Sequence, residues 1–583
     1  MTLLFKIKLL NNYLTNYEKI TFVLITFIGL LSAFIEIATI GLVYIFFSFL
    51  LDTNEVIENK YFLIIQKMNW GMPMEKYLLL IILIIFIFKS VFYISFRGFF
   101  YNFTKKMQTK FGCNILHNYL NKNFSFFLKH TKSRVINNIG VIPNSIIQHF
   151  IGGGLDITIS LITIFILLGF LFTVSPTISI LIIIASILFC SLYFFCISDF
   201  LKKQGDIMVK SNETLYKRLN EFVDGIKSII IFDLKKKFFT EIEQTISTRN
   251  KISKNIGLVS EIPKVSLELL IIIFICTGVI IIYDSQNYQT LIPELILFGT
   301  TAIRVSPHLS KIMVNLNYFN LMEESLKRII SSDLQIKKSV KIKQEVNINL
   351  NKYIEFKDIK FKYVNDFVIK NLSIKIRKNK FIGFTGHSGS GKTTFINILL
   401  GLLEINKGQI LVDGKLITNQ TDLKSLSSFV PQEPFLLNTS LEENITLGKN
   451  PVNFTKNDLL KDFKEKKLGE GGVKLSGGQS QIVSFLRAIS HKKKILVLDE
   501  PTSSLDGKNE RNILNLIEKE KKNKTIIMIT HKINTLKKCD EIFLFKDGNI
   551  SSSGSFSKLY NKSRDFKTLV ELYKLDEYSK GIK

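Results

Sequence analysis

The chain has 583 residues, of which 77 are Lys or Arg and 49 are Asp or Glu, giving a net charge of +28. Its mean hydropathy of +0.23 is high for a soluble protein, and its length favours two or three domains over one. The basic residues are spread out without a recognition motif, so nucleic-acid binding is not expected, and the five single cysteines lack the spacing of a metal site.

The first 330 residues contain six apolar runs, at 20–51, 77–100, 152–174, 178–198, 265–283 and 290–313. Runs of this length predict membrane-spanning helices. The connecting segment 101–150 carries seven Lys or Arg and no acid, and 202–261 carries twelve against eight. By the positive-inside rule both segments and both termini are cytoplasmic. We therefore predict an all-α transmembrane domain of six helices over residues 1–330.

The long basic segments are themselves patterned. Residues 113–130 and 212–246 place apolar residues at helical spacing, which indicates that the spanning helices continue into the cytoplasm and turn through short connecting helices. On the other side of the membrane, residues 52–68 are typical of an external amphipathic helix at the surface.

After a lysine-rich linker at 331–350, strand and helix patterns alternate from residue 351 to about 560. This alternation predicts an α/β domain with a largely parallel sheet. Residues 561–583 form a charged C-terminal tail, predicted to be helical.

The sequence GHSGSGKTT follows an apolar strand, FIGFTG, and precedes a helical pattern. This is the strand–loop–helix context of a P-loop, in which backbone N–H groups and the helix N-terminus hold phosphates. Lys392 would reach the β- and γ-phosphates, and the Thr393 hydroxyl suits Mg²⁺. The predicted phosphate-binding residues are Gly386, His387, Ser388, Gly389, Ser390, Gly391, Lys392, Thr393 and Thr394.

A second motif, ILVLDEPTSSLD, begins with a buried strand and ends it with two acids. Asp499 at the strand's carboxyl end is a candidate for holding Mg²⁺ through water, and Glu500 is a candidate general base for the attacking water.

Between these motifs lies LSGGQ at 475–479, and after them IMITHK with His531. In this order the four motifs resemble an ATP-binding cassette ATPase, over residues 351 to about 560. The resemblance implies that Tyr363 stacks on adenine, that Gln432 senses Mg²⁺ and the attacking water, and that His531 steadies the γ-phosphate. It also implies that the signature residues Ser476, Gly477, Gly478 and Gln479 contact ATP held by a partner cassette, and that Asp506 lies between the two sites. ATP and Mg²⁺ are the implied cofactors, and a homodimer is implied by one cassette per chain.

The chain departs from the exporter pattern in three places. The segment from Gln432 to Leu475 is short, as though a helix of the helical subdomain were trimmed; Ile482 replaces a usual arginine; and Pro501 replaces a usual alanine. None of these removes a catalytic group, so we expect hydrolysis, whereas the trimmed subdomain puts its docking surface in doubt.

Six spans followed by a cassette resemble a homodimeric half-transporter of the exporter type, placed in a bacterial inner membrane. Residues 221–232 have the character of a region that docks on the cassette, although a solvated helix would look similar. Lys89, Lys264 and Arg304 fall in the inner half of the predicted membrane. A charge there is expensive, so either these side chains reach the lipid head groups or they line a basic cavity for an anionic substrate.

The order and spacing of FLIIQKMNWGMP, IFKSVFYI, EIPKVSLELL and AIRVSP also resemble the flippases of lipid-linked oligosaccharides. This resemblance implies a polyprenyl-diphosphate-linked glycolipid as substrate, but lysines at 89 and 264 stand where arginine is found in those proteins, so the cargo could differ. Export of another lipid, a peptide or a drug is one alternative. An ATP-binding channel or sensor with little turnover is another, disfavoured by the presence of Glu500, His531 and Gln432.

Overall fold

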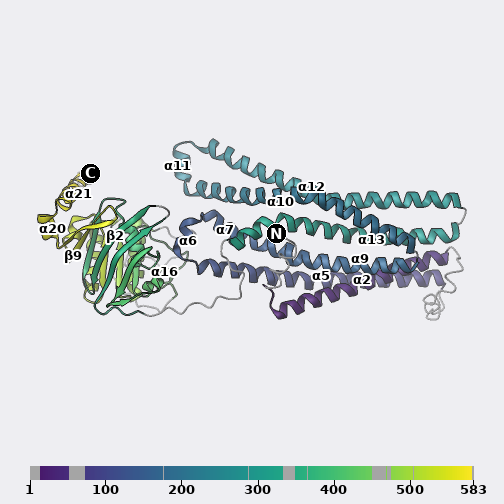
Figure 1. Ribbon diagram of the computed structural model, residues 1–583, viewed down its shortest axis with the longest axis horizontal. Helices are drawn as coiled ribbons and strands as arrows, with labels where there is room; N and C mark the ends of the chain where they lie inside the picture. Colours follow the sequence, from purple (N-terminus) through teal and green to yellow (C-terminus); the bar gives the residue numbers. More distant parts are fainter. Residues whose placement is uncertain are drawn as a thin grey trace. The chain divides into compact units, whose positions relative to one another are not determined.

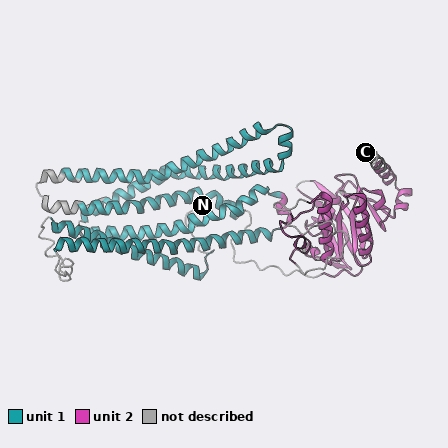
Figure 2. Ribbon diagram, turned by 180° about the vertical axis from the view of Figure 1, so that it is seen from behind, with its two compact units in different colours: residues 1–122, 129–341 teal, residues 123–128, 342–583 magenta. Residues whose placement is uncertain are grey.

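The computed structural model describes residues 13–50, 73–174, 176–285, 288–331, 348–363, 366–448, 468, 475–502 and 505–580. The chain forms two compact units: unit 1 comprises residues 1–122 and 129–341, and unit 2 comprises residues 123–128 and 342–583 (Figure 2). The expected external helix at 52–68, most of the linker and the shortened segment before Leu475, apart from Leu468, lie outside the described residues.

Long helices build unit 1, and each follows one of the apolar runs (Figure 1). They are α2 (Asn16–Leu50), α5 (Met74–Leu120), α9 (Gly153–Val174), α10 (Pro176–Asp224), α12 (Lys235–Ser285) and α13 (Tyr288–Leu321). Within the described residues, four stretches are long and apolar enough to cross a membrane: Asn16–Leu50, Met74–Leu120, Lys132–Thr173 and Ile182–Asp224. Helices α5, α10 and α12 run well beyond the apolar runs, so the predicted helical continuation into the basic segments is confirmed.

Short helices connect the long ones. They are α6 (Phe124–Lys129), α7 (Lys132–Gly140), α8 (Ile142–Ile147), the π-helix η1 (Gln148–Gly152), α11 (Ile226–Ile231) and α14 (Glu323–Ser331). The Thr131 side chain accepts from the backbone N–H of Arg134 and so begins α7 with a cap. The Phe150 and Phe319 rings stack at 4.8 Å and hold the π-helix against α13.

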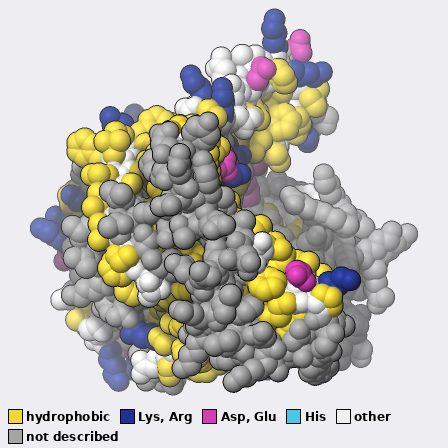
Figure 3. Space-filling view, turned by 90° about the vertical axis from the view of Figure 1, so that its right-hand side faces the viewer, with side chains coloured by type: hydrophobic (Ala, Val, Ile, Leu, Met, Phe, Trp, Pro, Cys, Tyr) yellow, Lys and Arg dark blue, Asp and Glu magenta, His cyan; other side chains and the backbone are white. Residues whose placement is uncertain are grey.

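The surface of unit 1 is apolar as well as its interior. Ile40, Leu167, Leu171, Phe298 and Val305 form a buried cluster between α2, α9 and α13. Figure 3 looks onto the end of the molecule at the right of Figure 1, and hydrophobic side chains cover much of the described surface there. An apolar exterior is expected of helices that contact lipid rather than water.

Unit 2 contains two sheets. The first is antiparallel, in the order β2-β1-β4-β5, formed by β1 (Tyr353–Lys362), β2 (Phe367–Arg377), β4 (Lys407–Val412) and β5 (Lys415–Leu416). The second has the order β10-β9-β3-β8-β7-β6, with β3 (Phe381–Gly386), β6 (Ser427–Val430), β7 (Ile495–Asp499), β8 (Thr525–Ile529), β9 (Glu541–Lys546) and β10 (Asn549–Gly554). Only its edge pair, β9 and β10, is antiparallel among the described strands. The expected largely parallel α/β sheet is confirmed.

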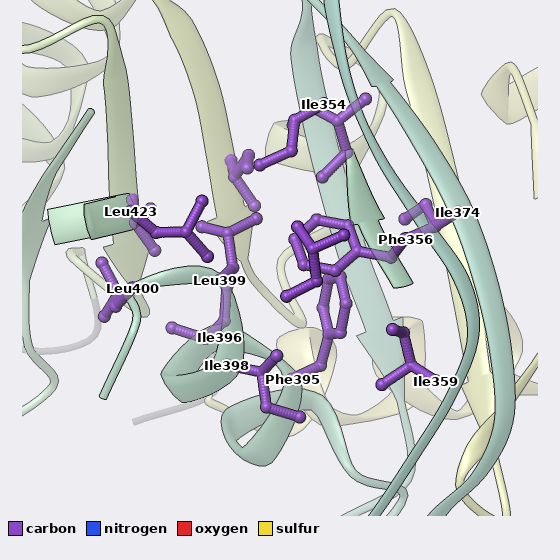
Figure 4. Packing of buried hydrophobic residues seen from close by; sticks show 14 of the residues in the cluster. Ile354, Phe356, Ile359, Ile374, Phe395, Ile396, Ile398, Leu399, Leu400 and Leu423 are labelled. Carbon is purple, nitrogen blue, oxygen red and sulfur yellow. The ribbon is translucent and has the colours of Figure 1, made fainter. Parts of the chain in front are cut away.

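Helix α15 (Lys392–Leu399) packs between the two sheets (Figure 4). The Phe395 ring contacts Phe356 of the antiparallel sheet at 5.0 Å and Phe384 of the parallel sheet at 5.6 Å between centroids. Because consecutive strand residues face opposite ways, Ile495 and Val497 join this cluster while Leu496 and Leu498 join a second one on the other face. The P-loop helix is thus fixed at the centre of the unit's core.

The second cluster is covered by α17 (Gly477–Ser490), α18 (Gly507–Glu520) and α19 (Ile533–Leu536), together with Ile445 of α16 (Leu441–Thr446). The 3₁₀ helix η2 (Gln420–Ser425) instead contributes Leu423 to the first cluster. The tail is helical as predicted, in α20 (Phe556–Lys562) and α21 (Arg564–Lys580). However, Phe566, Leu569 and Val570 are at most 2% exposed within this cluster. The first part of the tail therefore packs into the core of unit 2.

Residues 123–128 at the start of α6 belong to unit 2, where the Asn123 side-chain amide donates to Glu404 Oε1 at 2.8 Å. The segment predicted to dock, 221–232, contains α11 in unit 1, and its side chains Ile230, Ile231 and Phe232 are 57%, 74% and 71% exposed. Both basic segments therefore do form the short connecting helices that their patterns predict, and α11 leaves an apolar end uncovered in this single chain.

Candidate functional site

The P-loop lies between the carboxyl end of β3 and the start of α15. Gly386 has φ +143°, and a Cβ there would lie 2.2 Å from the carbonyl oxygen of Phe545, so only glycine fits between β3 and β9. Gly389 has φ +79° and faces open space, with nothing within 4 Å of a Cβ position. The loop is thus a concave backbone at a helix N-terminus, the geometry that holds phosphate groups.

Lys392 lies inside this loop. Its ammonium donates to the carbonyl oxygens of Gly386 and His387, both at 2.8 Å, and is 3.5 Å from Ser390 Oγ. Burial lowers the pKa of Lys392, while the carboxylates of Glu500 and Asp499 act in the opposite direction. Phosphate oxygens can replace these carbonyl and hydroxyl oxygens as acceptors, so the Lys392 ammonium can transfer its hydrogen bonds to a bound phosphate.

Three predicted catalytic side chains meet at the end of β7. Glu500 Oε2 accepts from the Gln432 amide at 3.3 Å, and its Oε1 is 3.4 Å from His531 Nε2. Glu500 adopts φ +46°, an uncommon backbone conformation for a residue other than glycine. The backbone N–H of Glu500 donates to Ile529 of β8 at 3.1 Å, so the adjacent strand fixes the carboxylate's position.

Asp499 ends β7 and is largely buried. Burial raises the pKa of Asp499, the neighbouring Glu500 raises it further, and Lys392 opposes both. A cation beside it would relieve this cost. Thr393, in the first turn of α15, is exposed and carries a hydroxyl suited to Mg²⁺. Asp499, Thr393 and the Gln432 side chain are oxygen donors of the kind that Mg²⁺ takes, so this end of the sheet fits a magnesium ion bound together with nucleotide phosphates.

Tyr363 stands beside the same helix. Its hydroxyl is 3.3 Å from Thr394 Oγ1, its ring contacts Phe361 edge-on at 5.0 Å, and it is 41% exposed. An exposed aromatic ring next to the P-loop is available for stacking on a base.

The signature segment opens α17 with a capping box: the Ser476 hydroxyl accepts from the backbone N–H of Gln479, and the Gln479 side chain accepts from the backbone N–H of Ser476. Gly477 and Gly478 form the first turn between them. Asp506 caps α18 by accepting from the backbone N–H of Asn509 at 2.8 Å. Gln481, which was not singled out in the sequence, also lies near the site, and its amide donates to the carbonyl oxygen of Glu500 at 3.5 Å.

The two units match two family descriptions. Residues 22–292 match the ABC transporter transmembrane region, and residues 369–503 match the ABC transporter domain. The chain thus carries the transmembrane region and the ATP-binding domain of an ABC transporter. Its fold is that of an ABC exporter as well: the structure of a bacterial Atm1-family ABC exporter with ATP bound superposes with a TM-score of 0.75 at 18% identity, covering 95% of this chain and 97% of that one. The cassette is an ABC transporter ATPase domain.

Among curated relatives, an export ATP-binding/permease protein of Rickettsia typhi is 36% identical over 234 residues. The match covers 37% of this chain and 41% of that protein. ABC transporter B family member 13 of Arabidopsis thaliana is 35% identical over 240 residues, which is 19% of its length. ABC transporter B family member 16 of the same plant is 27% identical over 401 residues, or 62% of this chain and 32% of that protein. The chain thus spans less than half the length of these relatives.

The three basic residues predicted in the inner half of the membrane, Lys89, Lys264 and Arg304, differ in their contacts in unit 1. Arg304 on α13 places its guanidinium 5.9 Å from the centre of the Phe86 ring, one helical turn before Lys89 on α5. Lys89 Nζ is 3.1 Å from Glu36 Oε1. Lys264 on α12 is exposed. Arg304 on α13 thus contacts α5 one turn away from Lys89. Among the described residues, no contact links Lys264 to either of them.

Acidic partners that the sequence reasoning missed accompany these cations. Glu36 on α2 pairs with Lys89 and also has its Oε2 3.4 Å from His308 Nε2. A second pair joins Arg97 to Asp156 at 2.7 Å. Glu36 is the one charged residue in the apolar run 20–51, and such a residue needs a partner. This signal was available in the sequence, although the identity of the partner was not.

An apolar cavity of about 410 Å³ lies within unit 1. It is lined by α9, α10, α12 and α13, with Phe189, Phe274 and Val305 among its walls. The predicted cationic residues are not among its lining residues. Unit 1 therefore offers one apolar space and, separately, a set of paired charges between α2, α5, α9 and α13.

Proposed function

We propose that the protein is an ATP-driven membrane exporter that works as a homodimer in a bacterial inner membrane. The observation that carries this proposal is the meeting of Gln432, Glu500 and His531 beside the P-loop. In it Glu500 acts as general base on the attacking water, His531 and Gln432 orient the γ-phosphate and the water, and Asp499 and Thr393 hold Mg²⁺.

Two features support a second copy. Ser476 and the signature glycines present a helix N-terminus, an anion-binding end, and we propose that it closes on ATP held by the partner's P-loop. The exposed apolar end of α11 supplies a surface for the partner's cassette, because large exposed apolar side chains on a polar segment mark a contact surface.

For cargo, we propose an anionic lipid, with a polyprenyl-diphosphate-linked glycan as the specific candidate, moved from the inner to the outer leaflet. Arg304 is the side chain best suited to bind a diphosphate, since its fork of donors matches phosphate oxygens and, among the described residues, it contacts Phe86 and no acid. Lys89 would have to leave Glu36 to take part, so it contributes to cargo binding only in a conformation that separates α2 from α5.

A second candidate, export of an apolar lipid, peptide or drug, is favoured by the cavity lined by Phe189, Phe274 and Val305. An apolar pocket of this size takes hydrophobic ligands without a fixed charge.

The test uses the purified full-length chain in proteoliposomes with Mg²⁺ and ATP. We expect hydrolysis that Lys392→Ala abolishes, and absence of hydrolysis would contradict the proposal. For cargo, Arg304→Ala should impair translocation of a diphosphate lipid at least about tenfold, the loss expected for one charge-assisted contact, while basal hydrolysis changes less than twofold. Equal loss of both activities would contradict a role of Arg304 in cargo binding and favour the apolar candidate.

A further inference from the structure

The C-terminal helix α21 brings a tyrosine to the hydrolysis site. Phe566, Leu569 and Val570 anchor the helix in the core cluster that also contains Leu498 and Met528, from the strands that end at the site. Tyr573 lies one turn beyond Val570, so it shares the anchored face, and its ring packs partly buried against the same cluster. Its position is therefore set by the cassette core.

Tyr573 contacts His531 in two ways. Its phenol oxygen forms a hydrogen bond with His531 Nδ1. The two rings also meet edge-on, with centroids 5.0 Å apart and planes at 81°. The hydrogen bond and the ring contact together fix the imidazole's orientation about its last side-chain torsion.

The protonation of the other ring nitrogen, Nε2, decides which partner donates in the hydrogen bond between Tyr573 and His531 Nδ1. His531 Nε2 is 3.4 Å from Glu500 Oε1, and because a carboxylate only accepts, the tautomer consistent with this approach carries its proton on Nε2. Burial and the charge of Lys392 lower the pKa of His531, with His387 acting in the same direction and Glu500 against it. The neutral imidazole has one proton, so Nδ1 is the acceptor and the Tyr573 hydroxyl is the donor.

We propose that Tyr573 is a positioning residue for ATP hydrolysis, which keeps His531 in the tautomer whose Nε2–H points to the reacting groups. The inference rests on the proposed ATPase function. In the other tautomer Nε2 would be an acceptor and could not donate to a γ-phosphate oxygen. The C-terminal tail, predicted from the sequence as a separate charged segment, therefore completes the hydrolysis site through His531.

The experiment compares Tyr573→Phe with the unchanged chain in detergent, with Mg²⁺ and ATP. This substitution keeps the ring packing and removes only the hydroxyl. We expect kcat to fall about tenfold, because the loss of one hydrogen bond leaves the tautomer unselected. The KM for ATP should change less than about twofold, since Tyr573 acts through His531 rather than on the nucleotide. Tyr560→Phe, in the preceding helix α20, is the matched control, and it should leave kcat unchanged.

The decisive readout is the double variant with His531→Ala. Once the imidazole is gone, Tyr573→Phe should lower kcat no further, whereas a merely structural tail would lower it again in that background. Unchanged or raised kcat in Tyr573→Phe, an equal loss in Tyr560→Phe, or independent effects of the two substitutions would overturn the positioning role alone. An unchanged chain that hydrolyses no ATP would overturn the proposed function along with it.

Discussion

The two units use charge in different ways. In the cassette, Lys392, Glu500 and His531 come from segments far apart in the chain, yet each directly follows a strand of one parallel sheet, β3, β7 or β8. In the membrane unit, Glu36, Lys89 and His308 come from three helices and meet only because those helices are rotated toward one another.

This difference decides what can be read from sequence. The carboxyl ends of adjacent parallel strands lie at one edge of the sheet, so a motif that follows a strand is placed by the topology. Topology does not set the neighbours of a charge in the middle of a long helix in this way, and its partner depends on how the helices pack. Substitutions in the cassette site should accordingly reduce ATP hydrolysis. Substitutions in the membrane cluster of Glu36, Lys89 and His308 should instead reduce the stability of the fold.

The largest expected effect is at Glu500, the proposed general base. Glu500→Gln should lower ATP turnover by about 10² to 10⁴-fold, because the amide cannot accept a proton from water. Binding of ATP should be retained. Glu433→Gln removes an exposed carboxylate next to Gln432 in the sequence and should leave turnover unchanged. Steady-state hydrolysis and binding of a fluorescent ATP analogue separate the two properties, and turnover preserved in Glu500→Gln would exclude this role.

Next in size is the P-loop backbone. Gly386→Ala places a methyl group 2.2 Å from the Phe545 carbonyl oxygen, so β3 and β9 must separate. We expect ATP affinity to fall by at least about tenfold, with a destabilisation of about 1–3 kcal/mol. Gly507→Ala is the matched control, since nothing lies within 4 Å of its added methyl. If both variants bind ATP equally, the close approach of the strands is not required.

The membrane cluster gives a smaller, purely structural effect. Glu36→Gln leaves Lys89 without its counter-charge, and we expect a destabilisation of about 2 kcal/mol, in the lower range for breaking a partly buried pair. Adding Lys89→Met should restore most of the loss, since it removes the orphaned charge. Thermal unfolding in detergent measures both, with exposed Glu75→Gln as control. If Lys89→Met does not restore stability, the loss in Glu36→Gln does not come from the unpaired charge of Lys89.

The smallest effect concerns the start of the cassette. Asp413 accepts from the backbone N–H groups of Asn351, Lys352 and Tyr353 at 2.6, 2.7 and 2.8 Å. Burial is the largest single influence and raises the pKa of Asp413, but the three hydrogen bonds together outweigh it and the net pKa is lowered. Its stabilisation is thus present above the unfolded pKa, near 3.8, and is lost as pH falls through the lower folded value.

Asp413→Asn tolerates the left-handed backbone at this position, φ +51°, and removes only the charge. We expect a loss of about 1 kcal/mol or less at pH 7, which disappears when both proteins are unfolded at acid pH. A loss that persists at acid pH would mean that the carboxylate charge is not its source.

Much of the fold and the nucleotide site could be predicted because their signals are local. The glycines and Lys392 lie in one strand–loop–helix segment, and Asp499 and Glu500 end another strand, so each proposed role follows from a short stretch of sequence. The helical continuation of α10 and α12 likewise follows from residue spacing. The packing of Phe566 and Val570 into the cassette could not be predicted, because a charged amphipathic helix looks the same whether it is docked or solvated.

In unit 1, by contrast, the sequence does not predict which residues pair. A lone acid such as Glu36 indicates that some partner exists, but the choice of Lys89 and His308 depends on the rotation of three helices. Tyr573 presents the same difficulty in the cassette, since nothing in its local sequence points to His531. Contacts between elements that do not meet at one edge of a sheet could not be predicted from the sequence.

The most direct test of the account is whether the signature of one copy closes on the P-loop of another. In a Glu500→Gln chain with its five native cysteines replaced, Ser388→Cys and Ser476→Cys should form a disulfide between chains when Mg²⁺, ATP and a mild oxidant are present. A covalent dimer that requires ATP and both cysteines is the predicted result. No dimer with ATP, or a bond confined to a single chain, would contradict the account.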